Sequence, residues 1–307
     1  MPVRPRWVLP VAFVSLGLIW GSSFAWIKIA VDDVPPATLV AWRMTLGAVG
    51  MLLLIAALRL RVPRGAGEWL PLVVLGAVNA AIPIFLISWG QQFVDSGTAA
   101  VLNSLTPIFS LLIAGIALRV EPVTALRVIG LLLGFVGAAL LASRELDLRA
   151  DASGLIGALA VVVAAFSYAV GASYARHRIQ RTHRYVVAGG TLLFAAADAW
   201  VLALLSDGGV VLPTQIESVV AIAWLGILGS FVAYVLFFFL IEHLGETMAS
   251  MVTYLFPVVG VGLGVLVLGE RMDVRLAVGT ILVLIGIIVV SLRYDASVSR
   301  VPSGVRE

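Results

Sequence analysis

The second half of this 307-residue chain repeats its first half within strongly apolar segments. Residues 97–121 read GTAAVLNSLTPIFSLLIAGIALRVE, and residues 247–270 read TMASMVTYLFPVVGVGLGVLVLGE. The aligned positions are Ala99 with Ala249, Pro107 with Pro257, Glu121 with Glu270 after a one-residue gap, Leu75-Gly76 with Leu225-Gly226, Gly130 with Gly279, and Gly137 with Gly286. Duplicated membrane halves are typical of secondary transporters, in which one repeat moves against the other around a midplane site. The duplication therefore favours a carrier over a receptor or an enzyme.

Composition agrees with a chain solvated mainly by lipid. Hydrophobic residues make up 61% and charged residues 12% of the sequence, against about 25% charged in soluble domains. The formal charge of +3 comes from arginines in short loops, so we interpret it as a topology signal and not as nucleic-acid binding. With no cysteine, the chain can form no disulfide, thiol nucleophile or cysteine metal site.

Ten stretches approach the roughly 20 apolar residues that cross a bilayer. The first is too long for the roughly 7–15-residue core of a signal peptide, so we expect it to be a retained span. Short loops leave no room for a soluble domain. The fold class is therefore predicted to be an all-α membrane protein with ten transmembrane helices at 7–29, 37–58, 69–90, 97–118, 126–143, 154–175, 185–205, 217–240, 246–268 and 274–292.

The distribution of arginine predicts the orientation of these spans. If the N-terminus is cytoplasmic, the opposite side receives four arginines, which are Arg144, Arg149, Arg271 and Arg275. The cytoplasmic side receives fourteen, which are Arg4, Arg6, Arg59, Arg61, Arg64, Arg119, Arg127, Arg176, Arg178, Arg181, Arg184, Arg293, Arg300 and Arg306. We therefore expect a multi-pass protein of the bacterial inner membrane with both termini in the cytoplasm.

Five spans per repeat is an odd number, so the second repeat must cross the membrane in the opposite sense to the first. The expected domains are a first five-helix repeat at 1–146, a second and inverted repeat at 147–295, and a cytoplasmic tail at 296–307. The two repeats are predicted to enclose a central cavity about a pseudo-two-fold axis in the membrane plane.

Several motifs resemble the ten-span EamA-type exporters of the drug/metabolite transporter superfamily. These are Trp20-Gly21-Ser22-Ser23-Phe24, Trp42-Arg43, and the Pro107 and Pro257 helices followed by loops with Glu121 or Gly269-Glu270. The resemblance covers about residues 10–293 and implies export of small metabolites. Within the superfamily, the chain looks most like the bacterial exporters of aromatic and other neutral amino acids. It departs from the pattern at 119–121, where Arg-Val-Glu replaces the usual Gly-Glu.

The resemblance also implies that spans 1, 3, 4, 6, 8 and 9 line the cavity and that the other four lie outside it. Polar groups in hydrocarbon usually face a bundle interior or a cavity. Midspan hydroxyl, amide and aromatic side chains on those six spans are therefore our candidates for binding substrate. They are Trp20, Ser23, Asn79, Ser88, Asn103, Thr106, Tyr168, Ser230, Tyr234 and Tyr254.

Two prolines and three charges complete the set of candidate functional residues. Pro107 and Pro257 each remove a helical hydrogen bond near midspan, and we expect hinges there. Asp198 is the one well-embedded carboxylate and the candidate for proton coupling, or it pairs with Arg43. Arg43 is a candidate to bind a substrate carboxylate or to pair with a helix C-terminus, and we favour a structural role because span 2 is expected to be peripheral. Lys28 is expected to extend outward from the end of span 1.

The sequence predicts export of amino acids, aromatic and other neutral ones preferred, by alternating access. The alternative within the superfamily is export of drugs or other small metabolites. An enzyme would need a nucleophile–base pair or a metal cluster at membrane depth, and the three histidines lie at loops or span ends. We expect no catalytic residue, cofactor or metal, and no nucleic-acid partner. Both repeats lie in one chain, so a monomer in the lipid bilayer would suffice. Facilitated and proton-coupled transport both remain open.

Overall fold

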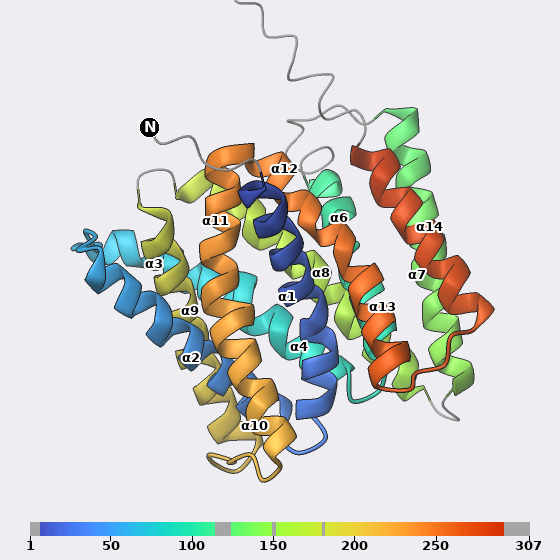
Figure 1. The fold of residues 1–307 in the computed structure, drawn as a ribbon, viewed down its shortest axis with the longest axis horizontal. Coiled ribbons are helices and arrows are strands. Elements are labelled where there is room, and N and C mark those ends of the chain that lie inside the picture. Colours follow the sequence, from blue (N-terminus) through green and yellow to red (C-terminus); the bar gives the residue numbers. More distant parts are fainter. Residues whose placement is uncertain (1–6, 114–123, 149–151, 180–181, 292–307) are drawn as a thin grey trace, which may run out of the picture.

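The computed structural model describes residues 7–113, 124–148, 152–179 and 182–291, which form helices joined by short loops (Figure 1). The predicted Glu121 loop and the 296–307 tail lie outside these ranges. In chain order, the first repeat contains α1 (Val8–Ala30), α2 (Pro36–Ala57), α3 (Ala66–Gly76), the π-helix η1 (Ala77–Ala81), α4 (Ile82–Gly90), α5 (Ser96–Asn103), α6 (Thr106–Leu112) and α7 (Ala125–Leu148).

The second repeat follows the same order. It contains α8 (Ser153–Arg178), α9 (Arg184–Ser206), α10 (Ile216–Ala223), the π-helix η3 (Trp224–Val232), α11 (Ala233–Leu244), α12 (Glu246–Ser250), the 3₁₀-helix η4 (Met251–Tyr254), α13 (Leu255–Val267) and α14 (Val274–Ser291). Eight described helices are long and apolar enough to cross a membrane, and shorter apolar helices at Ser96–Leu112 and Val274–Val290 lie where the other two spans were predicted. The all-α membrane fold is confirmed.

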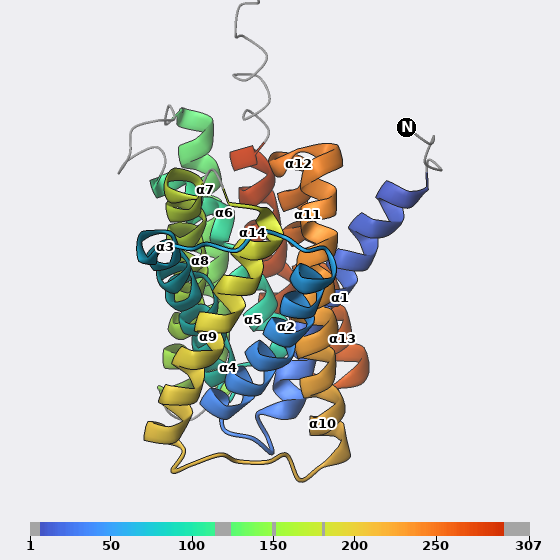
Figure 2. The same ribbon diagram turned by 90° about the vertical axis from the view of Figure 1, so that its left-hand side faces the viewer.

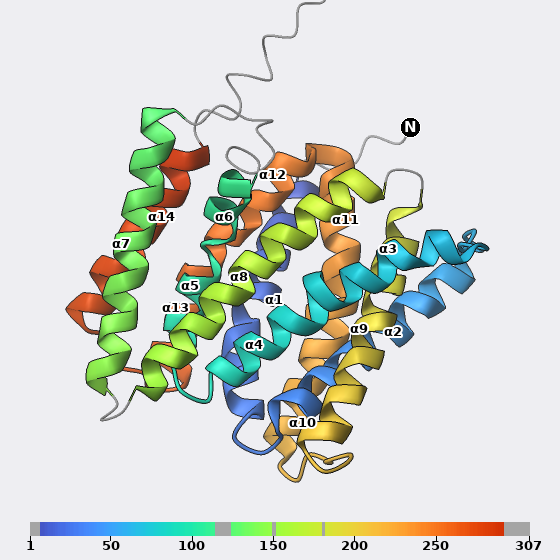
Figure 3. The same cartoon turned by 180° about the vertical axis from the view of Figure 1, so that it is seen from behind.

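Equivalent helices of the two repeats pack against each other, as an inverted duplication requires. The pair α2–α9 and the pair α7–α14 form extensive contacts and lie at opposite edges of the bundle (Figures 1 and 3). Helix α8 packs against α4, α5 and α6, and its counterpart α1 packs against α11, α13 and α10. Figure 2 shows α1 leaning away from the other helices toward its N-terminal end. Spans 2, 5, 7 and 10 are therefore peripheral and the other six are central.

Four glycines show the internal symmetry at the level of atoms. A Cβ at Gly130 would lie 2.8 Å from the Gly286 carbonyl oxygen, and a Cβ at Gly137 would lie 2.8 Å from the Gly279 carbonyl oxygen. Gly130 aligns with Gly279 and Gly137 with Gly286, so the two contacts are symmetry equivalents of each other. Small residues allow this close approach of helices in a membrane.

The described end of α7 differs from the prediction. We expected span 5 to end at residue 143, but α7 continues to Leu148. The reason is tertiary, because Arg144 and Glu145 are almost fully buried and are paired inside the bundle. They therefore extend a helix where their charges suggested a loop.

Candidate functional site

The third span of each repeat carries a π-helical stretch at midspan, η1 in the first and η3 in the second. In η3 the Ser230 hydroxyl donates to the Leu225 carbonyl 3.0 Å away, five residues earlier. The Gly229 carbonyl accepts a 3.0 Å hydrogen bond from the Trp20 indole N–H of α1. Single π turns within α-helices are frequent at functional sites. The η3 stretch, which continues directly into α11, is therefore hydrogen-bonded to α1 at the middle of the bundle.

Arg43 of α2 reaches the same place. Its Nε donates to the Ser230 Oγ at 3.2 Å, and only 7% of the residue is exposed. Tyr168 of α8 and Tyr234 of α11 lie close enough to interact electrostatically with the guanidinium. Ser23 belongs to the group as well, because a Cβ built on Gly229 would lie 3.3 Å from the Ser23 Oγ and 3.8 Å from the Arg43 Nη2. We call these residues the central cluster: Trp20, Ser23, Arg43, Tyr168, Ser230 and Tyr234.

Aromatic rings surround the Trp20 side of the central cluster. The Trp20 ring centroid lies 6.4 Å from that of Tyr234, 5.3 Å from Phe237 and 6.1 Å from Phe256. The contacts with Tyr234 and Phe256 are edge-to-face, an arrangement that adds stability beyond buried area. The combination of rings and hydroxyls offers both an apolar surface and hydrogen-bonding groups at midspan.

Five of the ten predicted binding residues thus come together, and the other five lie on the helices that correspond to the predicted spans. Asn79 of η1 packs against Gly171 of α8, and Tyr254 packs against the same apolar cluster as Trp20 and Tyr168. Ser88 and Asn103 are buried, and within the described residues the Ser88 Oγ and Asn103 Oδ1 have no hydrogen-bond partner. The Thr106 hydroxyl donates to the Asn103 carbonyl at 2.8 Å. Their role in binding stays a prediction.

Both predicted hinge prolines follow an interruption of their helix. The α-helix ends at Asn103 and restarts at Thr106, one residue before Pro107. In the second repeat, a 3₁₀ turn at Met251–Tyr254 precedes the helix that contains Pro257. The missing proline N–H and the tighter turn explain these breaks. A change in bending during transport stays a prediction.

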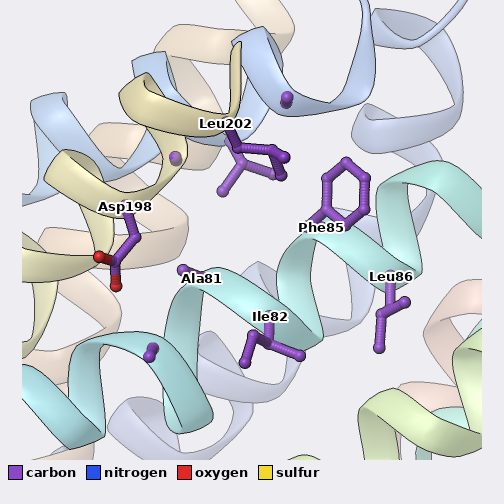
Figure 4. Close-up of a pocket in the computed structure, with 10 residues that line it drawn as sticks. Ala81, Ile82, Phe85, Leu86, Asp198 and Leu202 are labelled. Atoms are coloured by element: carbon purple, nitrogen blue, oxygen red, sulfur yellow. The ribbon is translucent and has the colours of Figure 1, made fainter. Parts of the chain in front are cut away.

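Asp198 lies apart from the central cluster, in a pocket of about 330 Å³ between α9, α2 and the η1–α4 segment (Figure 4). The other lining residues are apolar and include Ala81, Phe85 and Leu202. The expected pairing of Asp198 with Arg43 is wrong, because Arg43 points to Ser230 and no described ion pair joins the two residues. Its proton-coupling role stays a prediction.

The bundle end at which α1 finishes carries a polar network centred on Arg144. The guanidinium donates to Asp273 at 2.6 Å, to Asp95 at 3.0 Å and to Glu145 at 2.7 Å. Burial tends to raise the pKa of Asp273, but the Leu276 backbone N–H and Arg144 outweigh it and hold that pKa below its usual value. Sequence reasoning missed this network, since it treated Arg144 as a loop arginine that marks topology.

At the same end, three carboxylates cap helices of the opposite repeat. Glu270 accepts from the Ser96 and Gly97 N–H groups of α5 at 2.6 and 3.0 Å. Asp207 accepts from the Thr38 N–H of α2 at 3.0 Å and from its hydroxyl at 2.7 Å.

Asp33 completes the set by accepting from the Thr214 hydroxyl and from the Thr214 and Gln215 N–H groups, which precede α10. The Thr214 hydroxyl and the Gln215 N–H lower the pKa of Asp33. Negative charge at a helix N-terminus is stabilising. These three carboxylates therefore hold the two repeats together at one end.

Lys28 lies near the end of α1 and reaches the loop that follows α4. Its Nζ donates to the carbonyl oxygens of Gln91, the C-cap of α4, at 2.6 Å and of Val94, in the following turn, at 3.0 Å. A cation at the C-terminal end of a helix complements the helix dipole. Lys28 therefore ties α1 to α4 at the end that the carboxylates close.

Comparison with known proteins shows which family the chain resembles in sequence and in fold. A model of the EamA-like transporter family matches residues 8–143 and matches again at residues 155–292. A solved crystal structure shares the fold with a TM-score of 0.64 at 22% identity, over 95% of this chain and 99% of that chain.

Similar curated proteins are named as transporters. The chain is 24% identical to the uncharacterized transporter YoaV of Bacillus subtilis over 90% of this chain and 94% of that protein. It is 29% identical to the inner membrane transporter YedA of Escherichia coli K12, over 88% and 87% of the two chains. It is 26% identical to a probable terminal-alkyne amino-acid exporter of Streptantibioticus cattleyicolor, over 94% and 93%.

Proposed function

Because the chain belongs to the EamA-like transporter family, and is thus a membrane transporter and not an enzyme, we propose that it exports neutral amino acids, aromatic ones preferred. The observation that carries this proposal is the central cluster. It offers aromatic rings for an apolar side chain, and hydroxyls and a cation for a polar head group. The amino-acid exporter among its relatives supports the same substrate class.

Export of cationic drugs fits the cluster less well. Such substrates would be attracted by a carboxylate at the site, whereas the charge in the central cluster is the Arg43 guanidinium. Like charges in a low-dielectric interior repel strongly. The cluster therefore favours a substrate that carries a negative or zwitterionic head group.

Transport proceeds by alternating access in this proposal. The inverted repeats supply the two halves, and Pro107 and Pro257 act as hinges at their helix interruptions. The arginine distribution orients the network end toward the outside and both termini toward the cytoplasm. In this proposal, the Arg144 network and the three carboxylate caps close the outer side of the transporter.

The test is counterflow of radiolabelled phenylalanine into liposomes that contain the purified protein, with protein-free liposomes as the control. We expect exchange without an imposed gradient. An imposed pH gradient then separates the two forms of transport. Accumulation that disappears in Asp198→Asn would make Asp198 the coupling site, and equilibration that ignores the gradient would make the protein a facilitator. A protein that exchanges no neutral amino acid would contradict the proposed function.

A further inference from the structure

We propose that Arg43 binds the carboxylate of the transported molecule, so that the central cluster selects substrates bearing a carboxylate. This inference rests on the proposed function for the site's location and adds the group that recognises the substrate. The sequence alone favours a structural role for Arg43, because α2 is expected to be a peripheral helix. The helix is peripheral as expected, but its Arg43 side chain extends inward to Ser230 of η3.

Arg43 is a buried cation that no described carboxylate compensates. Arginine stays protonated in proteins, so its charge must be stabilised where it lies. Arg144, which is also buried, is stabilised by contacts with three carboxylates, those of Asp95, Glu145 and Asp273. Among the described residues, Arg43 makes one hydrogen bond, to the neutral Ser230 hydroxyl. Uncompensated charge at membrane depth is costly and marks sites that bind substrates or ions.

The free hydrogen-bonding groups around Arg43 suit a carboxylate. Only Nε is engaged among its five N–H donors, and within the described residues the four donors on the terminal nitrogens have no acceptor. The phenol groups of Tyr168 and Tyr234 lie nearby and likewise make no hydrogen bond to a described residue. A guanidinium binds carboxylate through two parallel N–H···O bonds, and phenol hydroxyls can donate to the same oxygens. The Ser230 bond fixes the orientation of the guanidinium.

The internal symmetry shows that the architecture does not require this cation. A Cβ at Gly226 would lie 3.2 Å from the Arg43 carbonyl oxygen, and a Cβ at Gly76 would lie 3.1 Å from the Thr191 carbonyl oxygen. Gly76 and Gly226 are aligned positions, so the residues whose carbonyl oxygens they approach are equivalent as well. Thr191 of α9 is therefore the counterpart of Arg43 of α2. The second repeat makes the same helix contact with a neutral residue. The charge on Arg43 is thus free to serve a function that belongs to one repeat alone.

The experiment measures binding to purified wild-type protein in detergent, using two pairs of probes. One pair is phenylalanine and phenylalaninamide, and the other is 3-phenylpropionate and its amide. We expect each acid to bind at least about tenfold more tightly than its amide, the discrimination that a charge-assisted hydrogen bond supplies. Arg43→Gln should abolish this preference and leave amide binding within about twofold of wild type. Arg43→Lys keeps the positive charge but loses the planar guanidinium that can make two parallel hydrogen bonds. This variant should therefore retain part of the preference for the acid.

Two control variants test whether the effect is specific to Arg43. One removes a positive charge elsewhere, and the other alters the equivalent position in the second repeat. Lys28→Gln removes another cation from a membrane span, and Thr191→Ala alters the symmetry counterpart of Arg43. Both should keep the acid-over-amide preference. Gel filtration and thermal unfolding establish that each variant is folded. If Arg43→Gln does not fold, the wild-type preference and its reduction in Arg43→Lys still decide the matter.

The outcomes separate this inference from the proposed function. Wild-type protein that binds acids and amides equally, or Arg43→Gln that keeps the preference, would overturn the role of Arg43 while leaving amino-acid counterflow as a separate result. An Arg43-dependent preference for 3-phenylpropionate without phenylalanine transport would uphold the role of Arg43 and overturn amino-acid export.

Discussion

At the scale of single residues, burial of similar side chains has different consequences because their partners differ. Arg144 is neutralised by surrounding carboxylates and therefore serves to hold helices together. Arg43 has a hydroxyl for its partner and is available to a ligand. Ser230 is the link, since it donates to the Leu225 carbonyl through the π-helical turn and accepts from Arg43. A π turn therefore supplies the geometry that presents the cation at midspan.

Trp20 offers a test of the cluster that leaves Arg43 intact. Trp20→Phe keeps an aromatic ring but removes the indole N–H that donates to the Gly229 carbonyl. We expect about 1 kcal/mol less stability from the lost hydrogen bond. The KM for phenylalanine counterflow should rise several-fold, because η3 loses the bond that fixes it to α1. The control is Trp7→Phe, at a residue 63% exposed, which should change neither quantity. Equal effects in both variants would contradict the assignment.

At the scale of elements, close helix contacts depend on glycines at a few sites and not on glycine content in general. The α7–α14 contact has a glycine of one helix against a carbonyl oxygen of the other at two symmetric points. By contrast, a Cβ at Gly262 of α13 would meet nothing within 4 Å. The packing role of a glycine therefore depends on its position, since Gly137 of α7 sits against α14 and Gly262 of α13 faces open space.

This contrast gives a matched pair of substitutions. Gly137→Ala places a methyl group 2.8 Å from the Gly279 carbonyl oxygen and should destabilise the protein by about 1–3 kcal/mol through overpacking. Gly262→Ala should be neutral or stabilise by up to about 1 kcal/mol, because alanine favours a helix. Thermal unfolding in detergent measures both. A Gly137→Ala protein as stable as wild type would contradict the close packing of α7 and α14.

At the scale of the whole molecule, one end of the bundle is fastened across the repeat boundary. Asp33 of the first repeat caps α10 of the second, and Asp207 and Glu270 of the second cap α2 and α5 of the first. Gly269, with φ of 69°, turns the chain so that the Glu270 N–H can donate to the Gly264 carbonyl at 2.9 Å. In the proposed alternating-access cycle, opening this end would require these contacts to break and form again.

Glu270 provides the test of this closure. Glu270→Gln removes the charge that two α5 N–H groups bind and should shift the population toward the state open at that end. The chain has no cysteine, so a single reporter introduced by Ser23→Cys can be labelled cleanly. An impermeant maleimide added outside cells should label the reporter several-fold faster in Glu270→Gln. Glu217→Gln, which alters an exposed residue at the same end, is the control. Unchanged labelling would contradict a closing role for Glu270.

Much of the fold could be predicted because its determinants are local or periodic. Long apolar stretches must become helices in a membrane, since backbone groups have no other partners there. The repeat then implies inversion, because each half has an odd number of spans. Trp20, Ser23, Tyr168, Ser230 and Tyr234 could be found because polar groups at midspan of the central helices tend to face one another.

The remainder depended on contacts between residues far apart in the chain. The sequence by itself determined the membrane class, the duplication and the approximate place of the apolar spans, because apolar length and aligned motifs are properties of short segments. Only the tertiary structure decided that Arg43 reaches Ser230 and not Asp198, that Arg144 is buried among carboxylates, and that three carboxylates cap the opposite repeat. The direction of a long side chain is set by the helices packed around it, and that packing is not encoded in any single segment.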